Sequence, residues 1–337
     1  MNEDPLLEIL AGVAPGTPLR DALDNILRAR TGALIIIGGE PAIDEDCDGG
    51  FPLDVPFQHQ LVYELAKMDG AILLDRHLER IRRANVEMIP KKYAPSHETG
   101  MRHRTAERIA QTRDATVIAV SQRRQVVTLY RGQMRYMLHD LSYILTKATN
   151  ALASLGRYDR LFRSATRRLG EAEQEGLATL GEVAEVMRRG YIALKIRREI
   201  KRYVVELGRD GHLIDLQLEE YPDIYWEWLW LWRDYQREAN APPPPWEEAE
   251  SWNTTAWGIA LGFDSLGQPL SPRGYRWLYH LQLLPGPVID RLGSHFASRQ
   301  ALAEATAEEL SLVGGIDHDT GYQLWTALHS GLGKTDA

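Results

Sequence analysis

An arginine–histidine–arginine run is the part of this sequence best suited to chemistry. Arg102, His103 and Arg104 are followed by Thr105, at the expected start of a helix. A helix N-terminus presents free backbone N–H groups and a positive dipole end, and arginine binds phosphate oxygens through two parallel hydrogen bonds. The run therefore predicts a triphosphate cradle, although an isolated Arg-x-Arg pair more often lies on a solvated basic face of a helix.

Positive charge is unevenly distributed along the chain. Residues 101–135 contain eight arginines against Glu107 and Asp114, whereas the 337 residues together carry a net charge of −8. A protein with this overall charge is not a general binder of polyanions. The positive charge is instead concentrated in the part of the chain that is expected to form an α/β domain.

A carboxylate and a glycine-bearing segment are the other candidates for chemistry. Asp69-Gly70-Ala71 stands at an expected helix-to-strand junction, where a carboxylate can hold Mg²⁺ or Mn²⁺ beside a phosphate and lower the pKa of a neighbouring hydroxyl. The glycine of Thr31-Gly32-Ala33-Leu34 permits close approach of backbone to a ligand. Taken alone, Asp-Gly is more often only a turn, and a single glycine is a weak signal.

Alternating helices and strands must position these residues. Apolar periodicity predicts helices over residues 19–30, 59–68 and 103–113, and strands over residues 33–37, 71–74, 116–120 and 125–130. Short strands between helices are typical of an α/β domain with a mixed sheet covered by helices. We assign that domain to residues 1–136.

The pattern changes to helical after residue 136. One apolar stripe comprises Leu138, Leu141, Leu145, Ala148, Leu152 and Leu155, which predicts a long helix within an all-α spine over residues 137–270. Inside that region, residues 203–218 are expected to form a hairpin turning at Asp210-Gly211. Four tryptophans at alternate positions, Trp226 to Trp232, favour core packing over a membrane or partner surface, although one helix cannot point all four inward.

The last part of the chain, residues 271–337, is expected to be a small helical domain. The turn sequences Leu284–Pro287 and Val313–Asp317 each precede a predicted helix. The single cysteine, the acidic N-terminus and the absence of a run of about 20 apolar residues predict a cytoplasmic protein without a membrane partner.

The motifs together resemble a known family. The segments RTGALIII (30–37), YELAKMDGAILLD (63–75) and ETGMRHRTAER (98–108) are similar to the diadenylate cyclase domain. The segments 203–220 and 270–278 resemble the spine and the C-terminal domain of its DNA integrity scanning branch. The resemblance implies that two ATP molecules are condensed into cyclic di-AMP and two pyrophosphates, and that this activity is coupled to sensing of DNA structure.

The resemblance also implies residue roles. Asp69 would ligate Mg²⁺ or Mn²⁺ and join Arg102, His103 and Arg104 as the catalytic set, with the arginines and the histidine on the triphosphate. The remaining ATP-binding positions would be Gly32, Ala33, Leu34, Gly70, Ala71, Met101, Thr105 and Ser121. Two positions depart from the family: Met101 stands where members usually have threonine, and Gln122 where some have glutamate.

The same resemblance implies an octamer and a helix-hairpin-helix DNA-binding domain. Gly286, Gly314 and Gly315 would face DNA phosphates without reading sequence. Asp317 would face and repel the phosphates, and residues 272–337 hold five basic against seven acidic residues, so we expect weak DNA binding that salt abolishes. The alternative function is a DNA-binding sensor whose cyclase activity is weak or lost, an alternative that Met101 keeps open.

Overall fold

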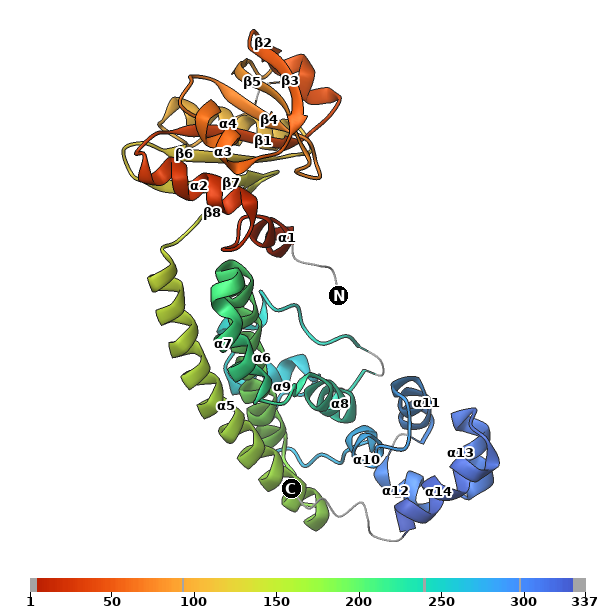
Figure 1. The fold of residues 1–337 in the computed structure, drawn as a ribbon. Coiled ribbons are helices and arrows are strands. Elements are labelled where there is room, and N and C mark those ends of the chain that lie inside the picture. The colour runs from red at the N-terminus through yellow and green to blue at the C-terminus, as the bar shows by residue number, and fades with distance from the viewer. Residues whose placement is uncertain (1–4, 93, 239–240, 297, 330–337) are drawn as a thin grey trace. The chain divides into compact units, whose positions relative to one another are not determined.

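The computed structural model describes residues 5–92, 94–238, 241–296 and 298–329, and the chain forms two compact units (Figure 1). The first unit comprises residues 1–149 and 201–215, and the second comprises residues 150–200 and 216–337.

A mixed sheet is the centre of the first unit. Its strands follow the order β2-β5-β4-β1-β6-β7-β8, and β3 pairs with β5. Strands β1 and β4 are parallel, while the other pairs are antiparallel. The predicted mixed α/β architecture is confirmed. The strands are β1 (Ala33–Gly38), β2 (Cys47–Asp48), β3 (Phe51–Pro56), β4 (Ala71–Leu74), β5 (Arg80–Met88), β6 (Ala115–Ser121), β7 (Val126–Arg131) and β8 (Met134–Met137).

Helices cover both faces of the sheet because successive strand residues point to opposite sides. Ile35 packs with helices α1 (Pro5–Gly12), α2 (Pro18–Arg28) and α3 (His59–Leu65) in one core cluster. Its neighbours Leu34 and Ile36 pack on the other face with Ala106, Ile109 and Ala110 of helix α4 (Met101–Thr112). Helix α4 therefore lies on the buried sheet with its first turn at one edge.

The helical region that was predicted after residue 137 is confirmed. Two long helices, α5 (Leu141–Glu175) and α6 (Leu180–Leu207), contribute to both units. Shorter helices follow: α7 (His212–Glu219), α8 (Tyr225–Tyr235), α9 (Thr254–Ala260), α10 (Tyr275–His280), α11 (Gly286–Phe296), α12 (Arg299–Glu304), α13 (Ala307–Gly314) and α14 (His318–His329). Helices α11 and α14 begin at or directly after the two predicted turn sequences. No helix in the described ranges is both long and apolar enough to cross a bilayer.

The predicted hairpin over residues 203–218 is wrong. Helix α6 continues to Leu207, a 3₁₀ turn spans Gly208–Gly211, and α7 follows. Tertiary contacts override the strand preference of Val204 and Val205, because Val205 packs against the first core cluster. Asp210-Gly211 lies in this 3₁₀ turn between the helices, and Gly208, which begins the turn, has a φ of 51°.

One member of the predicted apolar stripe of α5 is wrong. Leu145 is 37% exposed, and Ile144 takes its place among the buried residues Ala148, Leu152 and Leu155. The stripe still defines one buried face of the helix.

The tryptophans of α8 divide between two cores. Trp228, Trp230 and Trp232 are buried, while Trp226 is 51% exposed, as expected for alternate positions on one helix. The indole N–H of Trp228 donates to the carbonyl of Met187 at 2.9 Å. Trp230 stacks on Tyr275 with ring centroids 5.8 Å apart and packs among the buried residues of α10 to α14. Trp230 therefore holds the terminal helices to α8.

Candidate active site

Three segments that are distant in the sequence meet at one edge of the sheet. Leu34 of β1 pairs with Ala71 at the start of parallel β4, and the end of antiparallel β6 reaches the same edge at Ser121. A cleft of about 940 Å³ opens there, and Leu34, Asp69 and Ser121 line it. The segments that carried the sequence-predicted site are therefore brought together by strand register.

The first turn of α4 forms one wall of this cleft. Met101, Arg102, His103 and Thr105 line it, and Gly100 is the N-cap, with no side-chain hydrogen bond to the first turn. Because the first N–H groups of a helix have no partner within it, this turn offers donors to an anion. Met101, the first residue of α4, is 81% exposed, and its thioether cannot donate a hydrogen bond as a hydroxyl would.

Arg104 and two residues of the β1 segment lie outside the cleft lining. The Nε of Arg104 donates to the carbonyl of Glu98 at 3.3 Å, so this arginine supports the loop that leads into α4. Ala33 is buried in the core on the far face of the sheet. Gly32 lies directly behind Arg102: a Cβ at Gly32 would come within 2.1 Å of the Arg102 Nη1 atom. The glycine therefore makes room for the guanidinium.

Gly70 fixes the position of Asp69 by packing closely against β5. Its φ is 95°, and a Cβ there would approach the backbone of Asn85 at 2.7 Å and that of Val86 at 2.9 Å. Only glycine fits both the left-handed conformation and this close contact. The turn therefore presents the exposed carboxylate of Asp69 to the cleft.

The cleft can accept a divalent metal only together with an anionic ligand. Within the described ranges, no group of three or more His, Cys, Asp or Glu side chains is placed to hold a metal ion. Mg²⁺ is commonly held by one or two carboxylates, water and substrate phosphates, and Asp69 can supply such a carboxylate. The donor set therefore fits Mg²⁺ or Mn²⁺ bound with a triphosphate, with Asp69 as the protein ligand.

A hydrogen-bonded relay fixes His103 behind the cleft. The Nδ1 atom of His103 lies 2.9 Å from the Tyr130 hydroxyl, which donates to Glu98 Oε1 at 2.9 Å. Arg135 Nε donates to the same Glu98 oxygen at 2.6 Å. Because the tyrosine proton goes to Glu98, the phenol oxygen accepts from Nδ1–H, and Nε2 of a neutral His103 remains an acceptor.

Burial and charge set the ionisation of this relay. Burial lowers the pKa of His103, and the negative charge of Glu98 opposes that shift. Burial alone would raise the pKa of Glu98, but hydrogen bonds from Arg135 and Tyr130 outweigh it and leave that pKa below its usual value. Burial and Glu98 both raise the pKa of Tyr130. At neutral pH the arrangement therefore holds a neutral imidazole beside a charged carboxylate.

Sequence reasoning missed the relay and two cleft arginines. Glu98, Tyr130 and Arg135 belong to a loop and two strands, and only the fold brings them to His103. Arg123 and Arg124 line the cleft in the turn after β6, where the backbone N–H of Arg124 donates to Ser121 Oγ at 3.2 Å. The excess of arginine over residues 101–135 was the available signal. Gln122 lines the cleft beside them.

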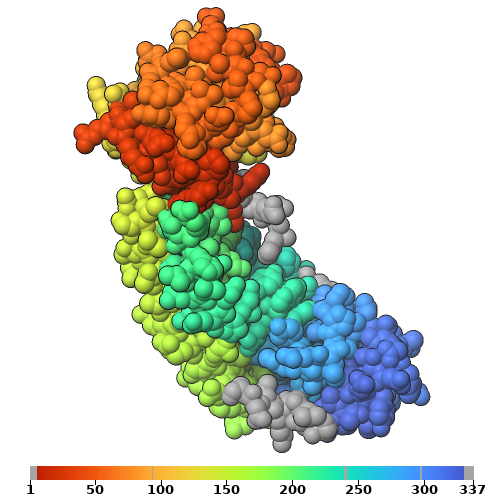
Figure 2. Space-filling model, viewed as in Figure 1, coloured from red at the N-terminus to blue at the C-terminus, as the bar shows by residue number. Residues whose placement is uncertain are grey.

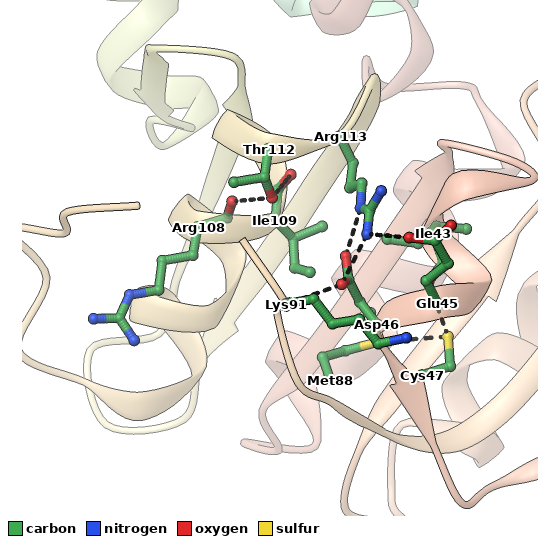
Figure 3. Close-up of polar contacts among 10 residues, drawn as sticks. All are labelled: Ile43, Glu45, Asp46, Cys47, Met88, Lys91, Arg108, Ile109, Thr112 and Arg113. Atoms are coloured by element: carbon green, nitrogen blue, oxygen red, sulfur yellow. Dashed lines mark hydrogen bonds and ion pairs between the residues drawn. The ribbon is translucent and has the colours of Figure 1, made fainter. Parts of the chain in front are cut away.

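The far end of α4 is tied down by a buried ion pair (Figure 3). Arg113, which follows the helix, donates to Asp46 through Nε at 2.6 Å and through an Nη atom at 2.9 Å. Asp46 is 1% exposed and also accepts the backbone N–H of Lys91 at 2.9 Å. One carboxylate thus joins α4 to the segment that leads from β5 toward the cleft.

The glycines predicted to contact DNA lie at two turns between helices. Gly286 is the first residue of α11, Gly314 is the last of α13, and Gly315 has a φ of 61° as the C-cap of α13. The Nε of Arg291 donates to the carbonyl of Gly314 at 3.1 Å. The contact of these glycines with DNA stays a prediction.

Asp317 binds the first turn of the helix that follows it, and its predicted repulsion of DNA phosphates stays a prediction. Its carboxylate accepts the backbone N–H of Thr320 at 2.9 Å and the Thr320 hydroxyl at 2.8 Å. The hydrogen bonds with Thr320 lower the pKa of Asp317. Asp317 therefore caps α14 and occupies an N–H group that a phosphate would otherwise bind.

Comparisons with known proteins agree with this geometry. A family described as "DisA bacterial checkpoint controller nucleotide-binding" matches residues 20–134, which contain the cleft. The "DisA bacterial checkpoint controller linker region" matches residues 138–253.

Curated relatives extend the match over nearly the whole chain. The DNA integrity scanning protein DisA of Carboxydothermus hydrogenoformans is 41% identical over 94% of each chain. This chain belongs to the DisA family. The DisA proteins of Symbiobacterium thermophilum (42% identical, over 92% of this chain and 91% of that protein) and Bacillus subtilis (40% identical, over 94% and 91%) are similar to it as well. The resemblance drawn from the sequence motifs is confirmed, and the cleft lies in the nucleotide-binding domain of the family.

Proposed function

We propose that this chain is a diadenylate cyclase that condenses two ATP molecules into cyclic di-AMP and two pyrophosphates. One observation carries the proposal: a single cleft joins the exposed carboxylate of Asp69 to the donor-rich first turn of α4 with Arg102 and His103. Membership in the DisA family, whose nucleotide-binding domain contains this cleft, supports the same conclusion.

The reaction consists of two equivalent phosphoryl transfers. In each, the 3′-hydroxyl of one ATP attacks the α-phosphorus of the other, an O–P bond forms, and the bond to the leaving pyrophosphate breaks. The hydroxyl proton is released, and the negative charge on the leaving group increases. Catalysis therefore requires positioning of the two nucleotides and positive charge at the pyrophosphate.

The cleft residues supply those requirements. The Arg102 guanidinium and the first-turn N–H groups of α4 bind the triphosphate, and Asp69 ligates Mg²⁺ or Mn²⁺ beside it. A metal held there would lower the pKa of the attacking hydroxyl and would offset phosphate charge. Burial keeps His103 neutral and the relay orients its ring, so its Nε2 accepts a hydrogen bond from the nucleotide or from a water that it binds.

One chain supplies one half of the reacting pair. It has one Asp69 and one Arg102–Arg104 run, whereas two ATP molecules must face each other. A two-fold arrangement of two cyclase domains satisfies both attacks. We propose that the active species is a homo-oligomer, an octamer by resemblance to the family.

We also propose that the helices α11 to α14 bind DNA phosphates through the turns at Gly286 and at Gly314-Gly315. Support comes from the place of these glycines at turns between helices and from the DNA integrity scanning name of the relatives. The capping role of Asp317 and the scarcity of free basic residues there predict weak binding.

Substitution of Asp69 tests the cyclase proposal. Asp69→Asn is nearly isosteric and removes the charge of the metal ligand, so we expect product formation from ATP with Mn²⁺ or Mg²⁺ to fall by orders of magnitude. Product analysis by chromatography measures this, with Asp21→Asn, an exposed carboxylate of α2, as the control. A folded Asp69→Asn protein with activity within a few-fold of the wild type would show that the assignment is wrong.

A further inference from the structure

An exposed row of arginines follows one face of α5. Arg157, Arg160, Arg163, Arg167 and Arg168 are all exposed, and the only acidic residue between the first and the last of them is Asp159. We call these five residues the arginine face. Figure 2 shows that α5, in yellow-green, forms part of the molecular surface.

Helix periodicity separates this face from the protein core. Leu155, Phe162, Ala165 and Leu169 are buried and recur at steps of three, four and seven. On a helix with 3.6 residues per turn these positions share the side opposite the arginines. The residues of the arginine face therefore take no part in core packing.

Most of the arginine face is not neutralised by the protein. Arg163 pairs with Asp159 at 2.9 Å, and Arg157 lies over the ring of Tyr158. Within the part of the chain that the structure describes, Arg160, Arg167 and Arg168 have no ion pair or hydrogen bond through their side chains.

Several basic residues of the neighbouring helix differ in this respect. On α6, Arg188 and Arg189 both pair with Glu185, and Lys195 pairs with Glu250. Acidic and basic residues one turn apart stabilise a solvated helix by pairing, as Glu185 does with these two arginines. The arginine face instead leaves at least three cations for an external anion.

The terminal helices have little positive charge to offer. Arg276 is 7% exposed and pairs with Asp234 at 3.0 Å. Arg291 donates to the Gly314 carbonyl, and Arg273 donates to the Arg237 carbonyl at 3.3 Å. A DNA-binding surface made of these helices alone would lack the phosphate contacts that supply most non-specific affinity.

A cavity connects the arginine face to the terminal helices. Arg163 and Arg167 of α5 line a cavity of about 620 Å³ together with Arg299 at the start of α12. The Thr166 hydroxyl and the Trp277 indole N–H are buried in residues that line it, without a hydrogen-bond partner among the described residues.

Carboxylates also line that cavity, and half of them are already paired. Glu173 and Asp234 both bind Arg276, whereas Glu171 and Glu227 have no ion pair within the described ranges. The positive charge of the cavity comes from Arg163 and Arg167 of α5 and from Arg299 of α12, and Glu171 lies on the same helix as the first two.

We propose that the arginine face of α5 is a second surface for the phosphates of duplex DNA, adjoining the terminal helices. The proposal rests on the DNA binding that is part of the proposed function. From Arg157 to Arg168 the helix rises about 16 Å. One DNA strand carries a phosphate about every 3.4 Å along the axis, so the face spans about five phosphates. Guanidinium contacts to phosphates position DNA without reading its sequence.

The experiment is a titration of linear and branched duplex DNA with full-length protein over a range of salt concentrations. In the triple variant Arg160→Gln, Arg167→Gln and Arg168→Gln, we expect at least a tenfold loss of affinity at low salt. The slope of log K against log salt should flatten by about 2–3 units because up to three phosphate contacts disappear. The corresponding Arg→Lys triple variant should retain most of the slope, since it retains the charges.

A second triple variant controls for net charge. Arg76→Gln, Arg188→Gln and Lys195→Gln remove three cations that each face a carboxylate, and should change the slope by less than one unit. Cyclase activity without DNA should be unchanged in both triple variants, because neither set lines the cleft.

Three outcomes would overturn the proposal. DNA binding by the wild type that both triple variants reproduce would show that the arginine face does not contact DNA, while leaving the cyclase and the terminal DNA-binding helices intact. A changed oligomer size by light scattering in the Arg→Gln variant would assign the face to contact between subunits. No DNA binding by the wild type at low salt would remove both DNA proposals, and the cyclase assay would still stand.

Discussion

At the scale of single residues, the lack of a side chain at Gly32 leaves the space that Arg102 occupies. A methyl group there would overlap the Arg102 guanidinium, while the backbone of Gly32 is not in the left-handed region. Gly32→Ala should therefore fold normally and push Arg102 away from the triphosphate. A lost charge-assisted hydrogen bond is worth about 1.5–3 kcal/mol, so kcat/KM for ATP should fall by about 10- to 100-fold.

The control for that prediction is Gly12→Ala at the end of α1. A Cβ at Gly12 would meet nothing within 4 Å, so activity should stay at the wild-type level. Steady-state kinetics on both variants, with circular dichroism for folding, decide the matter. Unchanged kcat/KM in folded Gly32→Ala would show that Arg102 does not need this position.

The relay behind His103 predicts opposite pH shifts for two substitutions. Burial has the largest effect on the pKa of His103 and lowers it. The charge of Glu98 raises this pKa, and the charge of Arg135 lowers it further. If activity requires neutral His103, the rate falls as pH drops through that pKa. Glu98→Gln should therefore move the acid limb of the kcat profile to lower pH, and Arg135→Gln should move it to higher pH.

Rate profiles from pH 5 to pH 8 measure both shifts, and Tyr130→Phe separates orientation from charge. That variant removes the hydroxyl that accepts from Nδ1, so kcat should fall while KM for ATP changes little. Acid limbs that coincide in the Glu98→Gln and Arg135→Gln enzymes would contradict the relay.

Local motifs made part of this site predictable. Asp69, Gly70 and residues 101–105 predict a phosphate and metal site because the residues suited to such a site are adjacent in the sequence. Glu98, Tyr130 and Arg135 could not be assigned from the sequence, because nothing local indicates that a loop and two strands converge on His103. The contact between Gly32 and Arg102 likewise depends on where α4 lies over the sheet.

At the scale of elements, the ion pair between Arg113 and Asp46 should determine how firmly α4 is held. The Arg113 side chain is 6% exposed and that of Asp46 is 1% exposed, so Arg113→Leu leaves a buried carboxylate without its cation. Breaking a buried pair in this way costs about 3–5 kcal/mol. Thermal and denaturant unfolding of the full chain should show a destabilisation of that order in the transition of the first unit.

An exposed pair and a pH series sharpen this prediction. Arg76→Leu breaks a pair with Asp114 at the surface and should cost less than about 1 kcal/mol. Burial would raise the pKa of Asp46, but Arg113 outweighs it and lowers that pKa. The contribution of the pair is therefore present above the unfolded pKa of about 3.9 and is lost as pH falls through the lower folded value. Equal losses of stability from the two substitutions at neutral pH would show that the Arg113–Asp46 pair does not hold α4 in place.

The regular elements were predictable where the pattern was regular. Buried β1, β4 and β6 show as apolar runs, and the α2 and α4 helices show a clear period. Strand β5 was missed because register shifts and Arg82-Arg83 interrupt its alternation, and β3 because Pro52 and Pro56 are typical of edge strands. Residues 203–218 were misassigned because the tertiary contacts of α6 outweigh local strand preference.

At the scale of the whole molecule, the proposed reaction requires more than one chain. The described cleft contains a single carboxylate at the Asp69 position and one helix start bearing Arg102, so under the proposed mechanism each chain would activate one hydroxyl and bind one triphosphate. Two clefts would then have to face each other, and a defect in one should disable the pair.

Mixed assemblies of wild-type and Asp69→Asn chains test this arrangement. When the variant is in threefold excess and subunits exchange freely, wild-type chains make up about one quarter of all chains, but pairs of two wild-type clefts make up only about one-sixteenth of all pairs. Cyclic product should therefore fall well below one quarter of the undiluted rate. Pairs with one intact cleft form only one of the two bonds, so a linear dinucleotide should accumulate.

Exchange is verified beforehand with differently tagged chains, and the products are separated by chromatography. Activity that declines in proportion to the wild-type fraction after proven exchange would contradict shared clefts, as would an active monomer in light scattering.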